Sequence, residues 1–486
     1  MTHLRGERTM KRLTWIFSFA LVALAITPSK SAAQAGTIGK TASRIHETHE
    51  ANANPAWRDS LTCSQAPCVL PNVLLSPDPA NTPVIVVNPE NSQQFIAAVF
   101  DLNCFGDAAF GSADGGATWY FPGCSQFFDD TTPTLAYASN GIAYFAAAAY
   151  EPIEFNTTQD NGNTWSKTTV AAYPLFSQGS IVTPWLGIDN GQNSPSAQRI
   201  YIAATQIDHP GVQSQISVSH SSDGGNGWSL ITVDKVQAKP LVDQYSRVAV
   251  GPDGTVYVAW QRCVMTSRHV NCAGTEASML LSKSVDGGNT WSKPRVFARV
   301  RLVTDTCDCA FFGNVPHTTV GVANPPLLAT DSTGTLYAVM YNWTGKQMKV
   351  QLISSKDQGE TWSKPTAVAP PTETHDQFLP TVAVSSTGAV GVSWLDRRND
   401  RRNILYQPFT AVSTDGGASF GKNYALASTL SDTYYNYTLG DYMGNVWSGQ
   451  TLYTVWPDTR NAVMQNFVGG LRTKCGVWDL GRSLLP

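Results

Sequence analysis

Acidic residues that could transfer protons recur in four similar stretches of this chain. The stretches are Asp129-Asp130, Asp243-Gln244, Asp376-Gln377 and Asp441-Tyr442. Carboxylic acids that face each other across a bound sugar can act as general acid and base in glycoside hydrolysis. The candidate catalytic residues are therefore Asp130, Asp243, Asp376 and Tyr442.

Arginines and aromatic residues form a second group, which has binding chemistry. Two copies of Trp-x-Asp-x-Arg occur, at Trp394–Arg398 and Trp456–Arg460. An arginine can hold a carboxylate through two parallel hydrogen bonds, and a flat aromatic ring can stack on a sugar face. The candidate substrate-binding residues are Arg262, His375, Arg397, Asp441 and Arg460.

A structural interpretation of both groups stays open. Catalytic residues are normally unique, whereas acids and arginines that return from module to module can join neighbouring modules and cap strand ends. His375, Tyr442 and Arg262 do not recur in this way. They are the more informative candidates for that reason.

A repeated module must position these residues. Seven short segments rich in aromatic and β-branched residues are typical of strands, and turn sequences such as Ser139-Asn140-Gly141 precede most of them. The segments are Gln94–Phe100, Ile142–Ala149, Arg199–Thr205, Thr255–Trp260, Thr335–Tyr341, Ala389–Trp394 and Thr451–Trp456. First strands are expected before the turns, at Thr134–Tyr137, Arg247–Val250, Leu327–Thr330 and Thr381–Val384.

Each module except the last continues into one copy of an eight-residue pattern, Ser/Thr-x-Asp-x-Gly-x-Thr/Ser-Trp/Phe. The Asp can accept backbone N–H groups of its own turn, the Gly can take a positive φ, and the aromatic ring can be buried. Each copy therefore predicts the tip of a β-hairpin. The six copies are Ser112–Trp119, Thr158–Trp165, Ser221–Trp228, Ser284–Trp291, Ser355–Trp362 and Ser413–Phe420, and the third has Gly227 in place of Thr or Ser.

This pattern resembles the Asp-box, or BNR, repeat of sialidase-like β-propellers. Six copies spaced by about one propeller blade make the resemblance specific for fold. It implies an all-β propeller of four-stranded blades and a protein directed at glycans, with a glycoside hydrolase as one possible activity. It also implies structural roles, away from the active site, for Asp114, Asp160, Asp223, Asp286, Asp357 and Asp415.

The resemblance has limits at the residues that sialidases use. Those enzymes carry an Arg-Ile-Pro motif ahead of the first Asp-box, and residues 72–87 contain no arginine. The resemblance therefore does not extend to sialidase activity. Within it, Tyr442 could stand for the nucleophile and Asp130 for the acid, although no motif anchors either residue.

Seven modules predict seven blades, and six blades, the sialidase number, is the alternative. The last module lacks its own fourth strand, which Val73-Leu74-Leu75 could supply to close the ring. In such a blade the first and third turns share one end. The longer and more varied loops gather at the other end, where function is expected.

The N-terminus predicts export. Met10-Lys11-Arg12 begins a basic segment, an apolar run follows from Trp15 to Ile26, and Ala33-Gln34-Ala35 fits a cleavage site. We expect a bacterial-type signal peptide over 1–35, a flexible segment over 36–70, the propeller over 71–475 and a tail over 476–486. No other apolar run is long enough to cross a membrane.

Nine cysteines fit disulfides in an oxidising compartment better than a metal site. Short-range pairs are expected between Cys63 and Cys68, Cys104 and Cys124, and Cys263 and Cys272. The odd count leaves at least one thiol free or intermolecular. No cofactor or metal is implied.

The amino-acid composition restricts the classes of molecule that this protein is expected to bind. Charged residues are 14% of the 486-residue chain, and the net charge is -3, so no basic surface indicates nucleic acid. Two hypotheses remain. The first is a secreted, glycan-directed glycoside hydrolase or lyase that acts on an exterior polysaccharide, and the second is a non-catalytic propeller that binds carbohydrate or protein. Whether the chain is an enzyme is left open by its sequence.

Overall fold

The computed structural model describes residues 63, 65–128, 132–148, 152–208, 213–265, 272–304, 312–433 and 439–474. Contacts divide the chain into two units, 1–56 and 57–486, and every described residue belongs to the second. The expected signal peptide, Asp130, Cys307, Cys309 and Cys475 lie outside the described residues. None of the described helices is long and apolar enough to span a membrane.

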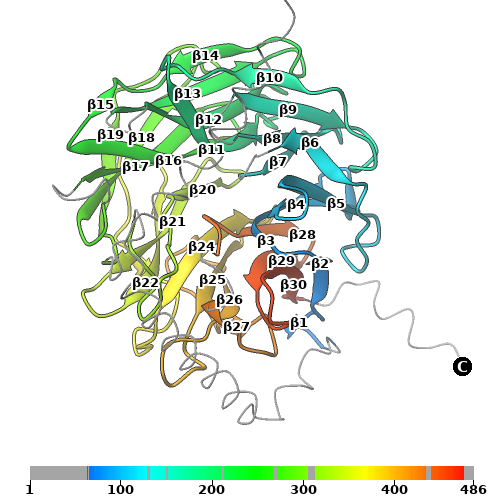
Figure 1. The fold of residues 1–486 in the computed structure, drawn as a ribbon, viewed down its shortest axis with the longest axis vertical. Helices are drawn as coiled ribbons and strands as arrows, with labels where there is room; N and C mark the ends of the chain where they lie inside the picture. Colours follow the sequence, from blue (N-terminus) through cyan, green and yellow to red (C-terminus); the bar gives the residue numbers. More distant parts are fainter. Residues whose placement is uncertain are drawn as a thin grey trace, which may run out of the picture. The chain divides into compact units, whose positions relative to one another are not determined.

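Seven antiparallel sheets form a seven-bladed β-propeller, as predicted (Figure 1). Blade 1 is β3 (Ala80–Asn88), β4 (Asn91–Asp101), β5 (Gly106–Ser112) and β6 (Cys124–Phe128); blade 2 is β7 (Thr134–Tyr137), β8 (Ala143–Ala147), β9 (Ile153–Thr158) and β10 (Thr169–Ala172). Blade 3 is β11 (Gly179–Ile188), β12 (Ile200–Asp208), β13 (Gln213–Ser221) and β14 (Ser229–Thr232), with β15 (Gln237–Ala238) also paired to β13. Blade 4 is β16 (Leu241–Val250), β17 (Val256–Val264), β18 (Glu276–Ser284) and β19 (Arg295–Arg301).

The remaining blades complete the ring. Blade 5 is β20 (Leu327–Thr330), β21 (Leu336–Trp343), β22 (Met348–Ser355) and β23 (Thr366–Ala367); blade 6 is β24 (Gln377–Val384), β25 (Val390–Asp396), β26 (Gln407–Ser413) and β27 (Tyr424–Ala425). Blade 7 is β28 (Gly444–Ser448), β29 (Thr451–Asp458) and β30 (Gln465–Arg472), with β1 (Cys68–Val69) and β2 (Val73–Ser76) paired to β30.

The second strand of every blade lies where the sequence predicts it, and its apolar side chains are buried on both faces. Trp260, Trp394 and Trp456 are fully buried on β17, β25 and β29. A strand packed between two other blades has no solvent face, so a nearly continuous apolar run replaces the alternating pattern. This burial makes the second strands the core of each blade.

The N-terminal strand closes the ring, as the sequence predicts. In β2, Val73 pairs with Val468 and Leu74 pairs with Phe467 of β30. The side-chain amide of Asn72 then donates to the carbonyl oxygen of Leu426 in blade 6 at 2.7 Å. Because β2 covers the outer edge of β30, blade 7 is completed by residues from the opposite end of the described chain.

The innermost strands contain a bulge that the sequence did not reveal. Four of them shift register around a non-glycine residue with positive φ: Thr82, Thr183, Tyr245 and Leu379. β16 and β24 therefore begin six and four residues before the predicted starts at Arg247 and Thr381. The bulge bends the strand and turns the next side chain toward the centre of the ring.

The repeated Asp hairpins form as predicted. In the fourth copy, one oxygen of Asp286 accepts the Ser284 hydroxyl at 2.8 Å and the Thr290 N–H at 2.9 Å, and the other accepts the Thr290 hydroxyl at 2.6 Å. These bonds lower the pKa of Asp286 to about 2. The hairpin is thus held by a carboxylate that stays ionised at neutral pH.

A glycine in each hairpin docks the blade on the preceding blade. Gly225 has φ of +93°, and a Cβ at this position would lie 2.2 Å from the ring of Phe155 in blade 2. The Trp228 indole N–H donates to the Gly225 carbonyl oxygen at 3.0 Å, while the Trp228 ring packs on Phe155 at 4.9 Å. The hairpins therefore join consecutive blades as well as ending strands.

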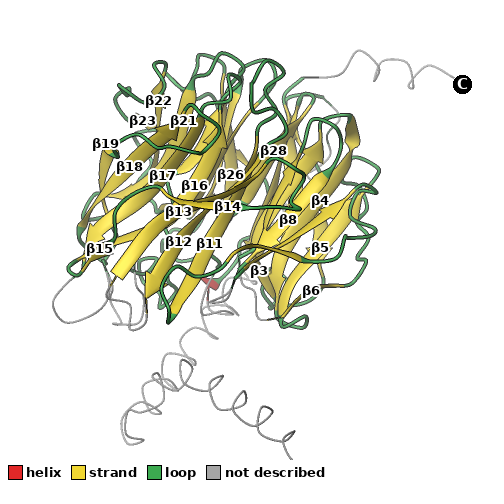
Figure 2. Ribbon diagram, turned by 90° about the horizontal axis from the view of Figure 1, so that it is seen from above, coloured by secondary structure: helices red, strands yellow, loops and turns green. Residues whose placement is uncertain are grey.

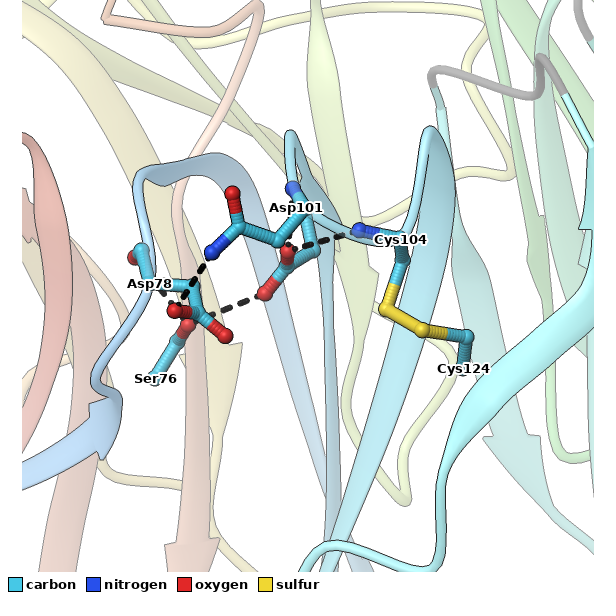
Figure 3. Close-up of a disulfide and its surroundings, with 6 residues drawn as sticks. Ser76, Asp78, Asp101, Cys104 and Cys124 are labelled. Carbon is cyan, nitrogen blue, oxygen red and sulfur yellow. Dashed lines mark hydrogen bonds between the residues drawn. A yellow bond between two sulfur atoms is a disulfide. The ribbon is translucent and has the colours of Figure 1, made fainter.

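The three expected disulfides are present: Cys63–Cys68, Cys104–Cys124 and Cys263–Cys272. The second joins the turn between β4 and β5 to the outer strand β6 (Figure 3). Asp101 secures the same turn, because its carboxylate accepts the N–H groups of Asn103 and Cys104 and the Ser76 hydroxyl. Blade 1 is thereby tied to the strand that closes the ring.

Replacing Gly225 by alanine tests the docking of blade 3 on blade 2. We expect Gly225→Ala to lower the free energy of unfolding by about 2–4 kcal/mol, from positive φ and from overpacking against Phe155. Gly224→Ala is the matched control, because Gly224 also has positive φ but meets nothing within 4 Å. The control should lose about 1 kcal/mol. Urea unfolding measures both, and equal losses would contradict a role for the Phe155 contact.

Candidate functional site

The two ends of the propeller differ in what they carry (Figure 2). The end with the Asp hairpins, here called the hairpin end, also holds the turns between the first and second strands. The opposite end, here called the loop end, holds the connections between second and third strands and those between blades. All sequence-predicted site residues in the described part of the chain lie at the loop end, where β16, β24 and β28 begin and where β17, β25 and β29 finish.

The two Trp-x-Asp-x-Arg copies are closed structural units. Asp396 accepts the Trp394 indole N–H at 2.7 Å and two parallel bonds from Arg398 at 2.9 and 2.6 Å. Asp458 does the same with Trp456 at 2.9 Å and with Arg460 at 3.0 and 2.6 Å. The Arg460 guanidinium also lies 4.0 Å from the centre of the Phe467 ring. These contacts favour the structural interpretation of this repeat, including Arg460.

Asp243 and Arg262 form a similar pair in blade 4. Arg262 Nε and Nη2 each lie 2.6 Å from an oxygen of Asp243, and Nη2 also lies 2.6 Å from Asp234. Asp243 is fully buried, whereas the Arg262 side chain is partly exposed. Burial raises the pKa of Asp243 to about 6, against the lowering effect of Arg262. Asp243 and Arg262, both candidate site residues, are therefore paired with each other.

Asp376 and Arg397 are fully buried beside the start of β24. The Asp376 carboxylate accepts the Met348 N–H at 2.9 Å and the Asn403 amide at 2.6 Å. Arg397 Nη1 lies 3.6 Å from Asp376 and donates to the carbonyl oxygens of Pro316 and Asn403. Burial lowers the pKa of Arg397 to about 10. This pair joins the connection that enters blade 6 to the loop between β25 and β26.

His375 has a local partner that the sequence did not suggest. Its Nδ1 lies 2.6 Å from Oε1 of Glu373, and both side chains are partly exposed. Lys349 Nζ donates to the carbonyl oxygens of both residues. His375 is therefore held in one orientation at the loop end.

A cluster of four side chains crosses the centre of the ring, and we call Trp185, Arg247, Asp441 and Tyr442 the axial cluster. The Arg247 guanidinium lies 4.4 Å from the Trp185 ring centre and 5.2 Å from that of Tyr442. Trp185 and Arg247 are on β11 and β16, and Tyr442 precedes β28. Since blades 3 and 4 do not adjoin blade 7, these contacts span the central channel.

Arg247 is fully buried without a full set of partners. Its Nη1 donates to the Ser246 carbonyl oxygen at 2.9 Å, but Nε and Nη2 have no hydrogen-bond partner among the described residues. Burial lowers the pKa of Arg247 to about 10. Nε and Nη2 form the edge of the guanidinium that pairs with a carboxylate through two bonds. That edge is unused by the described protein.

Asp441 and Tyr442 complete the cluster with different properties. Asp441 is half-buried, and burial raises its pKa although the nearby Arg247 charge opposes the shift. Tyr442 is fully buried, donates its hydroxyl to the Pro133 carbonyl oxygen at 2.6 Å, and has its pKa raised well above 10 by burial. A tyrosine bound in this way is a positioning group rather than an ionised nucleophile in this conformation.

Sequence reasoning missed Arg247, Trp185 and Glu373. Arg247 was assigned to a strand, where an arginine in an otherwise apolar run, Arg247–Val250, was the available signal. Trp185 follows Thr183-Pro184, which resembles Thr132-Pro133 at the start of the preceding blade. Within the described residues, no cluster of three or more His, Cys, Asp or Glu side chains could hold a metal ion.

Replacing Arg262 tests how strongly the fold depends on the ion pair between Asp243 and Arg262. We expect Arg262→Met to lower the free energy of unfolding at pH 8 by about 3–5 kcal/mol, because Asp243 becomes a buried unpaired charge. The deficit should shrink toward pH 5, since a carboxyl whose folded pKa is raised gains a proton in the folded state as pH falls. Urea unfolding at both pH values measures the difference.

The exposed pair of Arg299 and Glu276 provides the control. Arg299→Met should cost no more than about 1 kcal/mol at either pH, because surface ion pairs contribute little. A deficit of Arg262→Met that is independent of pH would contradict the proposed protonation of Asp243.

Comparisons with known proteins identify the fold and not the family. No family model and no curated protein matches the chain. Among solved structures, a PL25 ulvan lyase, a polysaccharide lyase, matches with a TM-score of 0.53 and 9% identity, over 86% of this chain and 100% of that one. The Hadza microbial sialidase Hz136 matches with a TM-score of 0.44 and 15% identity, over 79% and 75% of the two chains.

A complex of the ulvan lyase with a GlcA(1-4)Rha3S saccharide is also similar, with a TM-score of 0.50 and 10% identity, over 86% of this chain and 100% of that one. At this level of identity the similarity shows a shared fold, and a fold does not carry an activity with it. The chain thus shares its overall fold with the ulvan lyase.

Proposed function

We propose that this protein is a secreted, glycan-directed propeller whose loop end binds polysaccharides that carry carboxylate or sulfate groups. The axial cluster supplies the anion-binding group, and the aromatic rings around it supply flat apolar surfaces. The saccharide-bound lyase of the same architecture and the sialidase-like Asp-box pattern both support a glycan ligand. Three disulfides support an oxidising, extracytoplasmic location.

The unused edge of Arg247 is the observation that carries this proposal. Burying a guanidinium is costly unless its charge and its N–H groups are compensated. Arg397, which is also fully buried, likewise has no partner for Nε and Nη2 among the described residues, but it has Asp376 at 3.6 Å and two carbonyl acceptors on Nη1. Arg247 has one carbonyl acceptor and the half-buried Asp441 nearby. An anionic sugar that reached Nε and Nη2 would supply the missing partner.

Trp185 controls access to that edge. Its ring covers the guanidinium, and it is only partly buried. A ligand reaches Nε and Nη2 by displacing this ring, which changes the environment of a tryptophan. Binding at the axial cluster is therefore coupled to a fluorescence change from Trp185.

A purely binding role is the conservative form of the proposal. Asp243, Asp376, Asp396 and Asp458 are each engaged in ion pairs or hydrogen bonds, so these acids do not form the open pair that glycoside hydrolysis requires. Asp441, half-buried and with a raised pKa, is the acid best placed to take part in chemistry. It keeps hydrolysis as a second candidate function.

Arg247→Met tests the proposal because it should weaken ligand binding while leaving the stability of the fold nearly unchanged. We expect binding of polyuronate or sulfated oligosaccharides to weaken at least tenfold, since one charge-assisted pair is lost. The free energy of unfolding should change by less than about 1 kcal/mol, because the variant removes an incompletely compensated buried charge. Isothermal calorimetry, tryptophan fluorescence and urea unfolding provide the measurements.

Two further variants sharpen this test. Arg299→Met removes an exposed arginine on β19 and should keep binding intact, while Trp185→Phe should keep binding but lose the fluorescence change. If Arg247→Met unfolds far more easily but binds acidic oligosaccharides with unchanged affinity, then Arg247 stabilises the fold and does not bind the ligand. Carboxyl-reduced oligosaccharides should bind the native protein no better than they bind the variant.

A further inference from the structure

The His375 and Glu373 pair has features that anion binding does not require. Oε1 of Glu373 accepts His375 Nδ1 at 2.6 Å and also the backbone N–H groups of Thr374 at 2.8 Å and His375 at 3.0 Å. Burial opposes ionisation, but these bonds lower the pKa of Glu373. The carboxylate is therefore charged at neutral pH while it faces the imidazole.

An ionised carboxylate fixes the tautomer of the histidine beside it. Because Glu373 can only accept, Nδ1 of a neutral His375 carries the proton and Nε2 carries the lone pair. The His375 side chain is 24% exposed. Nε2 is thus presented as a base by a group that also stabilises the imidazolium formed when it takes a proton.

The segment that carries the pair is fixed on both sides. Lys349 on β22 donates from Nζ to the carbonyl oxygens of Glu373 and His375, the second at 3.3 Å. On the other side, Asn403 accepts the Asp376 N–H at 2.9 Å and donates to its carboxylate at 2.6 Å. Fixing the backbone around a side chain in this way lowers the entropy lost when it reacts.

Two exposed arginines lie next to this segment. Arg401 and Arg402 directly precede Asn403, whose amide is bonded to the residue after His375. Neither arginine forms an ion pair with another described residue in this structure, unlike Arg398, which is held by Asp396. The loop that holds the backbone beside His375 therefore also carries two exposed cations.

This combination suits one reaction class better than hydrolysis. Hydrolysis of a glycosidic bond uses two carboxyl groups on opposite sides of the sugar. Elimination from a uronic acid needs one base for the carbon acid and a cation that stabilises charge on the carboxylate. Glu373, His375 and the nearby arginines supply a base and cations, which is the set that elimination requires.

We propose that His375, oriented by Glu373, is the proton-transfer residue of a β-elimination that cleaves hexuronate-containing polysaccharides. The proposal rests on the proposed function in requiring that an acidic glycan binds the loop end. It adds the class of substrate, a 4-linked hexuronate, and the class of reaction. His375 is the catalytic residue, and Glu373 is a positioning residue that acts through it.

The step balances without water or any other reactant. Nε2 of His375 removes the proton from C5 of the uronate, and the electron pair left behind forms a double bond between C4 and C5. The bond between C4 and the glycosidic oxygen breaks, and the departing oxygen takes the proton from the imidazolium. Arg401 or Arg402 holds the carboxylate and stabilises the negative charge that develops on it. The products are an unsaturated uronate and a new sugar hydroxyl.

The substitution His375→Asn separates catalysis from structure. An asparagine amide can still donate to Glu373 from the position of Nδ1, but it has no basic nitrogen. With polyuronates as substrates, we expect the native protein to produce the ultraviolet absorbance of the conjugated product. In the variant kcat should fall by about 10²–10⁴-fold while the dissociation constant of the oligosaccharide stays within about threefold.

Glu360→Gln is the matched control. Glu360 is an exposed carboxylate at the hairpin end, paired with Lys283 and Arg295, and its loss should leave turnover unchanged. Glu373→Gln should lower kcat less than His375→Asn does and should shift the pH dependence. A His375→Asn protein with native turnover would overturn the assignment, as would formation of reducing ends without the conjugated product.

Nitrogen NMR of the imidazole provides a readout that needs no turnover. Glu373 is the carboxylate in contact with the imidazole of His375, and Lys349 donates to the backbone carbonyl oxygens of both residues. We expect the neutral ring of the native protein to carry its proton on Nδ1. A proton on Nε2 would contradict the proposed base.

The outcomes separate this inference from the proposed function. Binding of polyuronates without any elimination product would overturn the role of His375 and leave the binding proposal standing. Absence of binding to all acidic oligosaccharides would overturn both. Unchanged binding in Arg247→Met together with native elimination rates would support the role of His375 and place the anion site elsewhere.

Discussion

Every blade of this propeller depends on a neighbour that covers each of its faces. The tryptophans at the centre of β17, β25 and β29 are fully buried only because an adjacent blade lies on each side. The ring has no terminal blade, since β2 pairs with β30 and so joins residues 73–76 to residues 466–468. Two short strands, β1 and β2, therefore cover the edge of β30 and complete blade 7.

Much of this architecture could be predicted because it is local and repeated. The Asp hairpins are specified within eight residues, and six copies reinforce one another. The second strands, the seven blades, the closing strand and the three disulfides were all predictable on that basis. The inner-strand bulges were not, because Thr82, Thr183, Tyr245 and Leu379 adopt positive φ without the glycine that usually announces it. Their conformation is imposed by packing at the centre of the ring.

The site was predictable by region but not by residue. A sequence shows that Asp396 and Arg398 are near each other, but not that they satisfy each other completely while the adjacent Arg397 turns to Asp376. The axial contact between Arg247 and Tyr442 joins residues 195 positions apart on blades that do not adjoin. Such contacts form only when the ring is closed, so the sequence alone does not reveal them.

The two ends of the molecule differ in what their charged groups contact. At the hairpin end, Asp286 and its equivalents accept bonds from their own turns, and this end holds the blades together. Toward the loop end, Thr183, Ser246 and Arg247 have buried polar atoms with no partner among the described residues, and Tyr201, His220 and Trp291 do so toward the hairpin end. Of these groups, only the Arg247 side chain is a cation. Such groups lower stability, and folded proteins tolerate them mainly where binding or catalysis offsets the loss. The repeated hairpins thus stabilise the ring, within which the proposed ligand would supply the partners that Nε and Nη2 of Arg247 lack.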